Sequence, residues 1–188
     1  MAMSLDWIIF ISILLLLAYT LIVIREEKSS FKENAKEKKF NQFKFFVPSW
    51  WGTVEDTDTL LRYQRLDTRY EWEAKFDFVT YYDKTISIEE QFKERIHTLN
   101  VLFDPDSGVI MNPSDFNKHQ QVINKRCSIV RIEGTATQDE IHRRYIDAFL
   151  VRDHKTQTAL FAVSTSSILN GLVEGPYFED VMLNFEIN

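Results

Sequence analysis

The chain has 188 residues, of which 45% are hydrophobic and 14% aromatic, and its net charge is −6. This content is enough for a folded core in one domain, excludes a disordered chain, and with its acidic balance argues against nucleic acid as a partner. The single cysteine, Cys127, excludes an intrachain disulfide framework and a cysteine-rich zinc site.

An uncharged apolar run follows a short N-terminal tail, residues 1–6. It reads WIIFISILLLLAYTLIVI, from Trp7 to Ile24, and as a helix it would span roughly 27 Å, close to a bilayer core. The run is apolar on every face, and it lacks the positive start and cleavage site of a signal peptide. We therefore predict a transmembrane helix (7–24) whose contacts with the lipid bilayer include Trp7, Ile8, Phe10, Leu15, Leu17, Tyr19 and Ile24.

The charges that flank this run predict its orientation. The N-terminal side carries only Asp6, whereas REEKSSFKENAKEKK on the other side is rich in lysine. The positive-inside rule then places the N-terminus outside and the large domain in the cytoplasm or its topological equivalent, with a periplasmic domain as the alternative. We interpret residues 25–41 as a charged tether, either a solvated linker or a helical extension of the anchor.

The remaining residues, 42–188, predict a soluble α+β domain. Residues 42–48 and 59–66 have the alternating pattern of strands, and 71–82 (EWEAKFDFVTYY) is the clearest half-buried strand. The short connection at residues 67–69 makes the second and third strands a hairpin.

The period then changes to that of a helix. Ser87 and Glu90 have the spacing of a capping box. An apolar stripe follows, made of Ile88, Phe92, Ile96, Leu99 and Leu102. After a turn in DPDSG, a second and weaker helix is predicted at residues 114–124.

Three more strands are predicted at residues 127–135, 143–152 and 158–165, with a hairpin turn at 153–156 between the last two. A final helix is predicted to begin with Pro176 in its first turn. Consecutive strands joined by tight turns indicate a mostly antiparallel sheet covered by helices.

Several segments resemble the Mog1/PsbP-like fold. FKFFVPSWW, followed by TLLRYQR, is similar to that family's first hairpin, in which a tryptophan closely follows a proline. RRYIDAFLVRD and ALFAVST resemble its late strand pair, and FEDVMLNFEI resembles its closing helix, with Asn184-Phe185 where Ser-Phe is expected. The resemblance implies a mostly non-enzymatic interaction module, since its members include small-GTPase binders and accessory proteins of photosynthetic membrane complexes.

Trp50 and Trp51 stand side by side between Pro48 and Gly52. We expect a structural role for them, with one covering the sheet edge near the proline. Adjacent residues of an extended chain point in opposite directions, so at least one indole is expected to be exposed. Both therefore remain candidate partner contacts, with contact to the membrane interface as a further alternative.

The residue types that carry chemistry form no recognisable motif. The histidines lack zinc-ligand spacing, and the glycines lack the spacing of a phosphate loop. Asp104 and Asp106 begin like a calcium loop, but the later ligands of that loop are missing, so a plain turn is the simpler interpretation. We expect no catalytic residues, no cofactor and no metal.

Three functions fit these features. The first is a single-pass membrane-anchored accessory or assembly subunit of an integral membrane protein complex, acting by protein–protein interaction. The second is a membrane-tethered module that binds a small ligand or a lipid. The third is a type IV secretion-like core subunit with a periplasmic domain, although such domains usually begin with helices. An enzyme that uses Cys127 or a serine is not expected.

Overall fold

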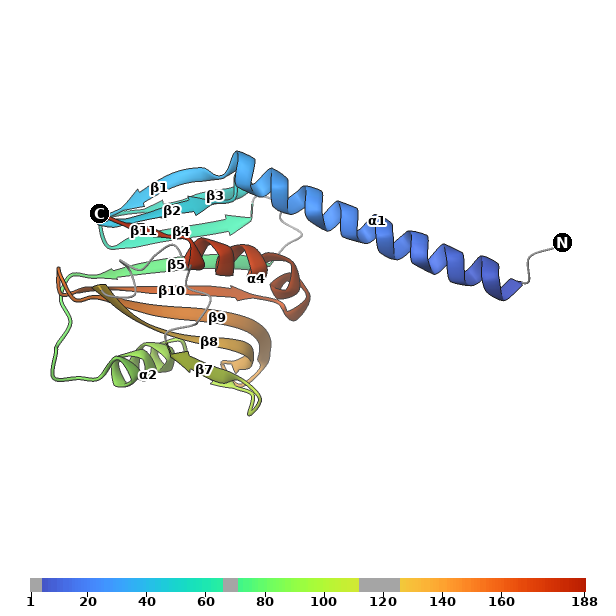
Figure 1. Cartoon of the computed structure of the whole chain (residues 1–188). Coiled ribbons are helices and arrows are strands. Elements are labelled where there is room, and N and C mark those ends of the chain that lie inside the picture. Colours follow the sequence, from blue (N-terminus) through green and yellow to red (C-terminus); the bar gives the residue numbers. More distant parts are fainter. Residues whose placement is uncertain (1–4, 66–70, 112–125) are drawn as a thin grey trace.

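The computed structural model describes residues 5–65, 71–111 and 126–188 (Figure 1). Helix α1 projects from a folded domain, and its start at Leu5 lies far from that domain. The helices of the described part are α1 (Leu5–Asn34), α2 (Ile88–Thr98) and α4 (Ile168–Leu183). The strands are β1 (Lys36–Phe40), β2 (Phe43–Val47), β3 (Trp51–Asp56), β4 (Leu60–Arg65), β5 (Trp72–Val79), β6 (Val101–Phe103), β7 (Gly108–Met111), β8 (Cys127–Gln138), β9 (His142–Asp153), β10 (Thr158–Ser166) and β11 (Glu186–Ile187).

The strands form two antiparallel sheets. The large sheet has the order β3-β4-β5-β10-β9-β8-β6, with β7 also paired to β8, and the small sheet has the order β1-β2-β11. Strands β9 and β10 pair from Asp153 opposite Thr158 to Tyr145 opposite Ser166, which confirms the predicted hairpin. The α+β class and the antiparallel sheet predicted from the sequence are therefore present.

The large sheet has a hydrophobic cluster on each face. On one face, Phe45 of β2 lies against Phe76 of β5, with ring centroids 5.0 Å apart, and α4 covers the same cluster. On the other face, Phe92 of α2 lies 6.3 Å from Phe161 of β10. The small sheet and α4 thus form one outer layer and α2 forms the other.

The predicted capping box begins α2. The Glu90 amide donates to the Ser87 hydroxyl at 3.1 Å, and the Ser87 amide donates to the Glu90 carboxylate at 2.9 Å. The predicted stripe was wrong at its end, because the helix stops at Thr98 and Leu102 lies on β6 with 76% of its surface exposed. The second helix predicted at 114–124 lies outside the described residues, as does the connection at 67–69.

The prediction for the last helix was wrong at its start. Helix α4 begins at Ile168, so Pro176 lies inside the helix rather than in its first turn. A Cβ atom at Gly171 would lie 2.4 Å from the Tyr145 ring of β9, and one at Gly175 would lie 3.2 Å away. These glycines look like helix breakers in the sequence, but here they let the helix approach the sheet closely.

The charged tether predicted at residues 25–41 is largely part of the folded structure. Helix α1 continues through Asn34, as the helical-extension alternative expected, but Phe31 is buried and residues 36–40 form β1. Lys36 pairs with Val47 in the register of β1 and β2. The folded domain therefore begins before residue 42, and a solvated linker was the wrong alternative.

Helix α1 is the one helix of the described part that is long and apolar enough to cross a membrane. The hydroxyl groups of Ser12 and Thr20 donate within the helix, each at 2.8 Å to the carbonyl four residues earlier. This leaves both hydroxyl groups satisfied without water. Each residue assigned to the anchor is exposed, namely Trp7, Ile8, Phe10, Leu15, Leu17, Tyr19 and Ile24.

The close contact of α4 predicts a difference between its two buried glycines. Alanine normally favours a helix over glycine by about 1 kcal/mol. We expect Gly171→Ala to lower the free energy of unfolding by about 1–3 kcal/mol instead, because the new methyl group overlaps the Tyr145 ring. Chemical denaturation of the full chain in detergent measures this. Gly175→Ala is the matched control, and a loss as large as that of Gly171→Ala would contradict the interpretation.

Candidate functional site

The two adjacent tryptophans converge on one buried carboxylate. Glu174 of α4 is fully buried and accepts hydrogen bonds from the Trp51 Nε1 at 2.9 Å and the Trp50 Nε1 at 3.4 Å. A turn makes this possible, because the Trp51 amide donates to the Pro48 carbonyl at 3.1 Å. Trp51 is itself buried and its ring lies 4.4 Å from the ring of Trp72.

Arg65 supplies the charge that balances this carboxylate. Its guanidinium pairs with Glu174, and its Cζ atom lies 5.9 Å from the centroid of the Trp50 ring. A buried carboxylate needs such donors, since an unpaired charge in a protein interior is strongly destabilising. Because protein donors engage both carboxylate oxygens, Glu174 is arranged as a structural group rather than as a general base.

An aromatic cluster joins this site to α1. Phe31 of α1 lies 6.1 Å from Trp50 and 5.4 Å from Tyr177 of α4, and the last two rings lie 5.0 Å apart and almost perpendicular. We call these three residues the junction cluster. Edge-to-face contacts of this kind stabilise by about 0.5–1.5 kcal/mol beyond the area they bury. The end of α1 is thus packed onto the domain and is more than a covalent connection to it.

A groove of ≈ 610 Å³ lies beside the junction cluster, between α1 and α4. On the α1 side it is lined by Ile24, Phe31 and Lys32. The α4 side is mainly apolar near Leu172 and Val173 and becomes acidic further along the helix.

Both candidate tryptophans point toward the interior of the domain in this structure. Trp51 is buried and Trp50 is partly buried, so the expected exposed indole is not found. The structural interpretation of the pair agrees with these positions. Sequence reasoning missed Glu174, although it is the one charged residue between Asp153-His154-Lys155 and Glu179. That isolation within an apolar segment was the available signal.

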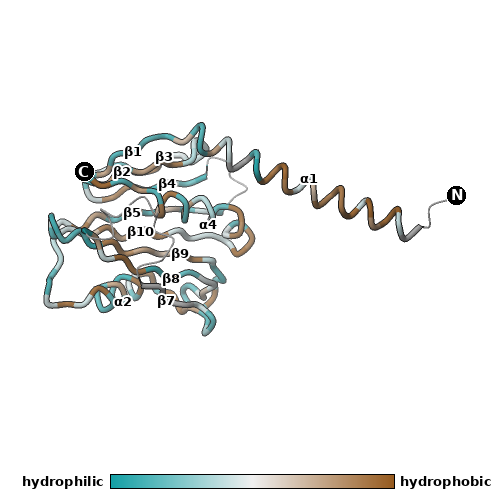
Figure 2. The backbone as a smooth tube through the Cα atoms, in the orientation of Figure 1, coloured by the Kyte–Doolittle hydropathy of each residue, from teal (hydrophilic) through white to brown (hydrophobic). Residues whose placement is uncertain are grey.

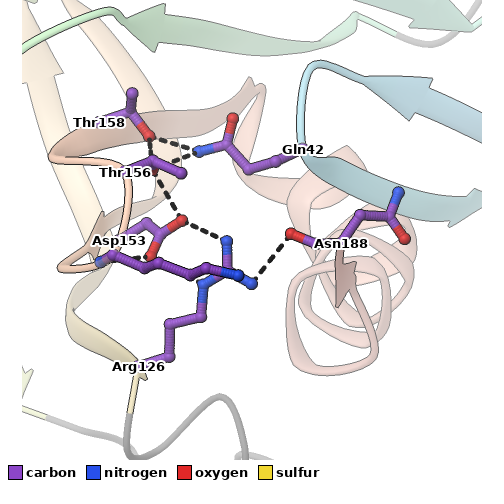
Figure 3. Close-up of polar contacts among 7 residues, drawn as sticks. Gln42, Arg126, Asp153, Thr156, Thr158 and Asn188 are labelled. Atoms are coloured by element: carbon purple, nitrogen blue, oxygen red, sulfur yellow. Dashed lines mark hydrogen bonds and ion pairs between the residues drawn. The ribbon is translucent and has the colours of Figure 1, made fainter.

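A second polar cluster lies at the end of the domain away from α1 (Figure 3). Asp153 pairs with Arg126, with nitrogen–oxygen distances of 2.9 and 2.7 Å, and accepts from the Thr156 hydroxyl at 2.7 Å. Arg126 also donates to the Asn188 carbonyl at 2.9 Å, and the Asn188 amide donates to the Gln42 carbonyl at 3.0 Å. The cluster therefore fastens residue 188 to the start of β2 and to the β9–β10 turn.

These bonds change the acidity of Asp153. Burial opposes ionisation of its carboxyl group, but the bonds from Arg126, Thr156 and the Lys155 amide outweigh burial and lower the pKa to about 2. The folded state therefore favours the carboxylate more than the unfolded chain does, and Asp153 stabilises the fold above pH 4.

Cys127 and His154 lie beside this cluster. Burial, reinforced by Asp153, raises the pKa of the Cys127 thiol to about 12, which favours the protonated thiol at neutral pH. His154 bonds through Nε2 to the Ser128 hydroxyl at 2.7 Å and through Nδ1 to the Tyr82 hydroxyl at 2.9 Å. The sequence did not indicate this serine–histidine contact. The other partner of the His154 ring is the Tyr82 phenol, which does not stabilise an imidazolium as the carboxylate of a catalytic triad does.

The DPDSG segment forms a turn, as expected. The Ser107 amide donates to the Asp104 carbonyl at 3.0 Å, and the Asp104 side chain accepts from Arg143 at 2.7 Å and from Thr135. Among the described residues, no group of three or more histidine, cysteine or acidic side chains is placed to hold a metal ion.

Comparison with solved structures identifies this arrangement of strands and helices. The solution structure of PsbP from Synechocystis sp. PCC 6803 aligns with a TM-score of 0.54 at 7% identity, over 82% of this chain and 94% of that one. The Ran-binding protein Mog1p of Saccharomyces cerevisiae aligns with a TM-score of 0.50 at 15% identity, over 82% and 95%. The chain has the Mog1/PsbP-like fold. No family model and no curated protein matches the sequence.

The Mog1/PsbP-like fold is the one that the sequence resemblance implied. The segment FKFFVPSWW forms β2 and the turn into β3, and Phe185 after α4 is fully buried with its ring 5.7 Å from Phe43. The type IV secretion-like alternative assumed a different fold, which this structure does not have.

Glu174 should be a major determinant of stability. We expect Glu174→Gln to lower the free energy of unfolding by about 3 kcal/mol, because it removes the buried negative charge that Arg65 and the two indole N–H groups engage. Denaturation of the full chain in detergent, followed by tryptophan fluorescence, measures the loss. Glu186→Gln is the control, since it removes a carboxylate from an exposed pair with Lys44 and should cost no more than about 1 kcal/mol. Equal losses would show that Glu174 has no special role.

Asp153 should make stability depend on acid pH. The folded pKa is depressed, so its contribution of about 2 kcal/mol is complete above pH 4 and is lost as the pH falls toward 2. We expect Asp153→Asn to lose this amount at pH 7 and to approach the unsubstituted chain near pH 2. Denaturation curves between pH 7 and 2 test this. Asp58→Asn, at an exposed turn, should change the value at pH 7 by less than about 0.5 kcal/mol.

Proposed function

We propose that this chain is a single-pass membrane protein that acts as an accessory or assembly subunit of a larger membrane protein complex. The observation that carries the proposal is the junction cluster. Phe31 is buried against Trp50 and Tyr177, and α1 runs without a break from its apolar part into this contact. The domain is therefore held at a fixed orientation to the anchor, as docking onto a neighbouring membrane protein requires.

The fold supports an interaction role over catalysis. The similar Mog1p is a Ran-binding protein, which is a protein-interaction function. In this chain the buried carboxylates Glu174 and Asp153 are engaged by protein donors, and the thiol of Cys127 is held protonated. Fold likeness alone does not fix function, so these local observations add necessary support. We propose a non-enzymatic role on this basis.

The flanking charges favour a cytoplasmic domain. Arg25 and Lys32 follow the apolar run, whereas Asp6 precedes it. Under the positive-inside rule the N-terminus is outside, and the partner surface of the complex then faces the cytoplasm or its topological equivalent.

Purification from native membranes tests the proposed role. The tagged full chain is extracted in mild detergent and its native mass is measured. We expect a stoichiometric complex with other membrane proteins, well above the 22.3 kDa of the chain. Phe31→Ala should reduce recovery of the complex, because it loosens the domain from the anchor while leaving both present. Recovery of the unsubstituted chain alone or as a homo-oligomer would overturn the proposal.

A further inference from the structure

The first half of α4 carries an apolar surface that the domain does not cover. Ile168, Leu169, Leu172 and Val173 are 36%, 76%, 67% and 45% exposed. Residues 168–173 read ILNGLV and contain no charge, and the next residue, Glu174, is turned inward. We call these four side chains the α4 apolar face. Its spacing of one, three and one residues places all four on one side of the helix.

This surface lies on the same side of the domain as the anchor. Helix α4 begins at the end of the domain from which α1 projects (Figure 1). The start of α4 is hydrophobic, and so is the part of α1 that lies away from the domain (Figure 2). Leu172 and Val173 line the groove between the two helices together with Ile24, the last residue of the apolar run. The exposed surface of α1 therefore continues onto α4.

The level of the α4 apolar face along the α1 axis determines how deep this face would lie in the membrane. Ile24 marks the end of the hydrocarbon-length run, and Phe31 lies seven residues later, roughly 10 Å further along the helix. Leu172 and Val173 of α4 line the same groove as Ile24 and Phe31, so they lie beside this stretch of α1. That interval corresponds to the headgroup region next to the hydrocarbon core.

We propose that the α4 apolar face inserts into the boundary between headgroups and acyl chains of the membrane that α1 spans. The occupant is lipid, and the proposal rests on the membrane anchoring in the proposed function. Leucine, isoleucine and valine side chains without an intervening charge are the residues that gain from such burial. The acidic residues of the groove, Glu179 and Asp180, come two turns later in α4, and Glu179 pairs with Arg131 at 2.7 Å.

Insertion would give the domain two contacts with one bilayer. The anchor fixes the domain through the junction cluster, and the α4 apolar face would limit rotation about the α1 axis. Because α1 already holds the domain at the membrane, the second contact forms as an intramolecular step. A modest buried apolar area is therefore sufficient for insertion. The β9–β10 turn and Asn188, at the other end of the domain, would then face away from the membrane.

Site-specific fluorescence in vesicles tests the insertion. Because Cys127 is the only cysteine, Cys127→Ala provides a background for single labels. Leu172→Cys and, in a second variant, Leu169→Cys carry an environment-sensitive nitrobenzoxadiazole label. The purified full chain is placed in phosphatidylcholine and phosphatidylglycerol vesicles that contain lipids spin-labelled near the headgroup. We expect blue-shifted emission and quenching roughly twofold or more above the control.

The control label is placed at Tyr81, which is 63% exposed next to the polar cluster at the far end of the domain. A label at Leu15→Cys, in vesicles whose lipids are spin-labelled near the end of the acyl chain, reports the anchor itself. Quenching at Leu15, at Leu172 and at Leu169, but not at Tyr81, supports the insertion. If the Leu15 label is quenched but the Leu172 and Leu169 labels are quenched no more than the Tyr81 label, the insertion is overturned. The anchored-subunit proposal is then left intact. If Leu15 is also unquenched, the anchor fails, and the insertion fails with it.

A protein occupant of the same surface gives a different result. If another protein covers the α4 apolar face, the Leu172 label shifts only after native membrane extract is added, and lipid quenchers have no effect in its absence. That result overturns the lipid assignment. Thermal unfolding of each labelled variant should match that of the unlabelled background, which excludes misfolding as the cause of any quenching.

Discussion

The position of α4 depends on one buried carboxylate. Glu174 is fully buried, and its side chain is satisfied by two indole N–H groups and by Arg65. These donors come from the turn before β3, from the first residue of β3 and from the end of β4, so the carboxylate ties the helix to the sheet edge. A buried charge tolerates little displacement from its donors, because desolvation is compensated only by good geometry. The register of α4 against the sheet follows from this requirement.

With its inner face fixed in this way, α4 has two unlike sides. Gly171 and Gly175 bring the helix close to Tyr145, and Phe178 and Met182 fill the core below. The other side carries exposed isoleucine, leucine and valine in the first half of the helix, which begins at the end of the domain from which α1 leaves. The same helix thus stabilises the fold and supplies the surface that the proposed membrane contact uses.

The junction cluster determines how the domain is oriented relative to α1. A solvated linker would let a tethered domain sample many orientations, since each flexible residue retains backbone freedom. In this chain Phe31 is buried and β1 joins the small sheet, so little free chain separates the apolar run from the domain. An orientation fixed in this way is useful to a subunit that must meet a neighbour in the same membrane. It gives less advantage to a module that only needs to be near the membrane.

The sequence by itself determined the local features, namely the apolar run at 7–24, the capping box at Ser87 and the paired strands around Asp153. Each depends on spacing within one segment, which periodicity and turn chemistry record directly. Only the tertiary structure decided that Phe31 is buried, that α4 begins before Pro176, and that Trp50 and Trp51 share one acceptor. Glu174 lies more than a hundred residues after the tryptophans, and no local pattern specifies a partner at that separation. Packing between distant segments also explains Gly171, where a side chain with a Cβ atom, which would favour the helix, would overlap the Tyr145 ring of β9.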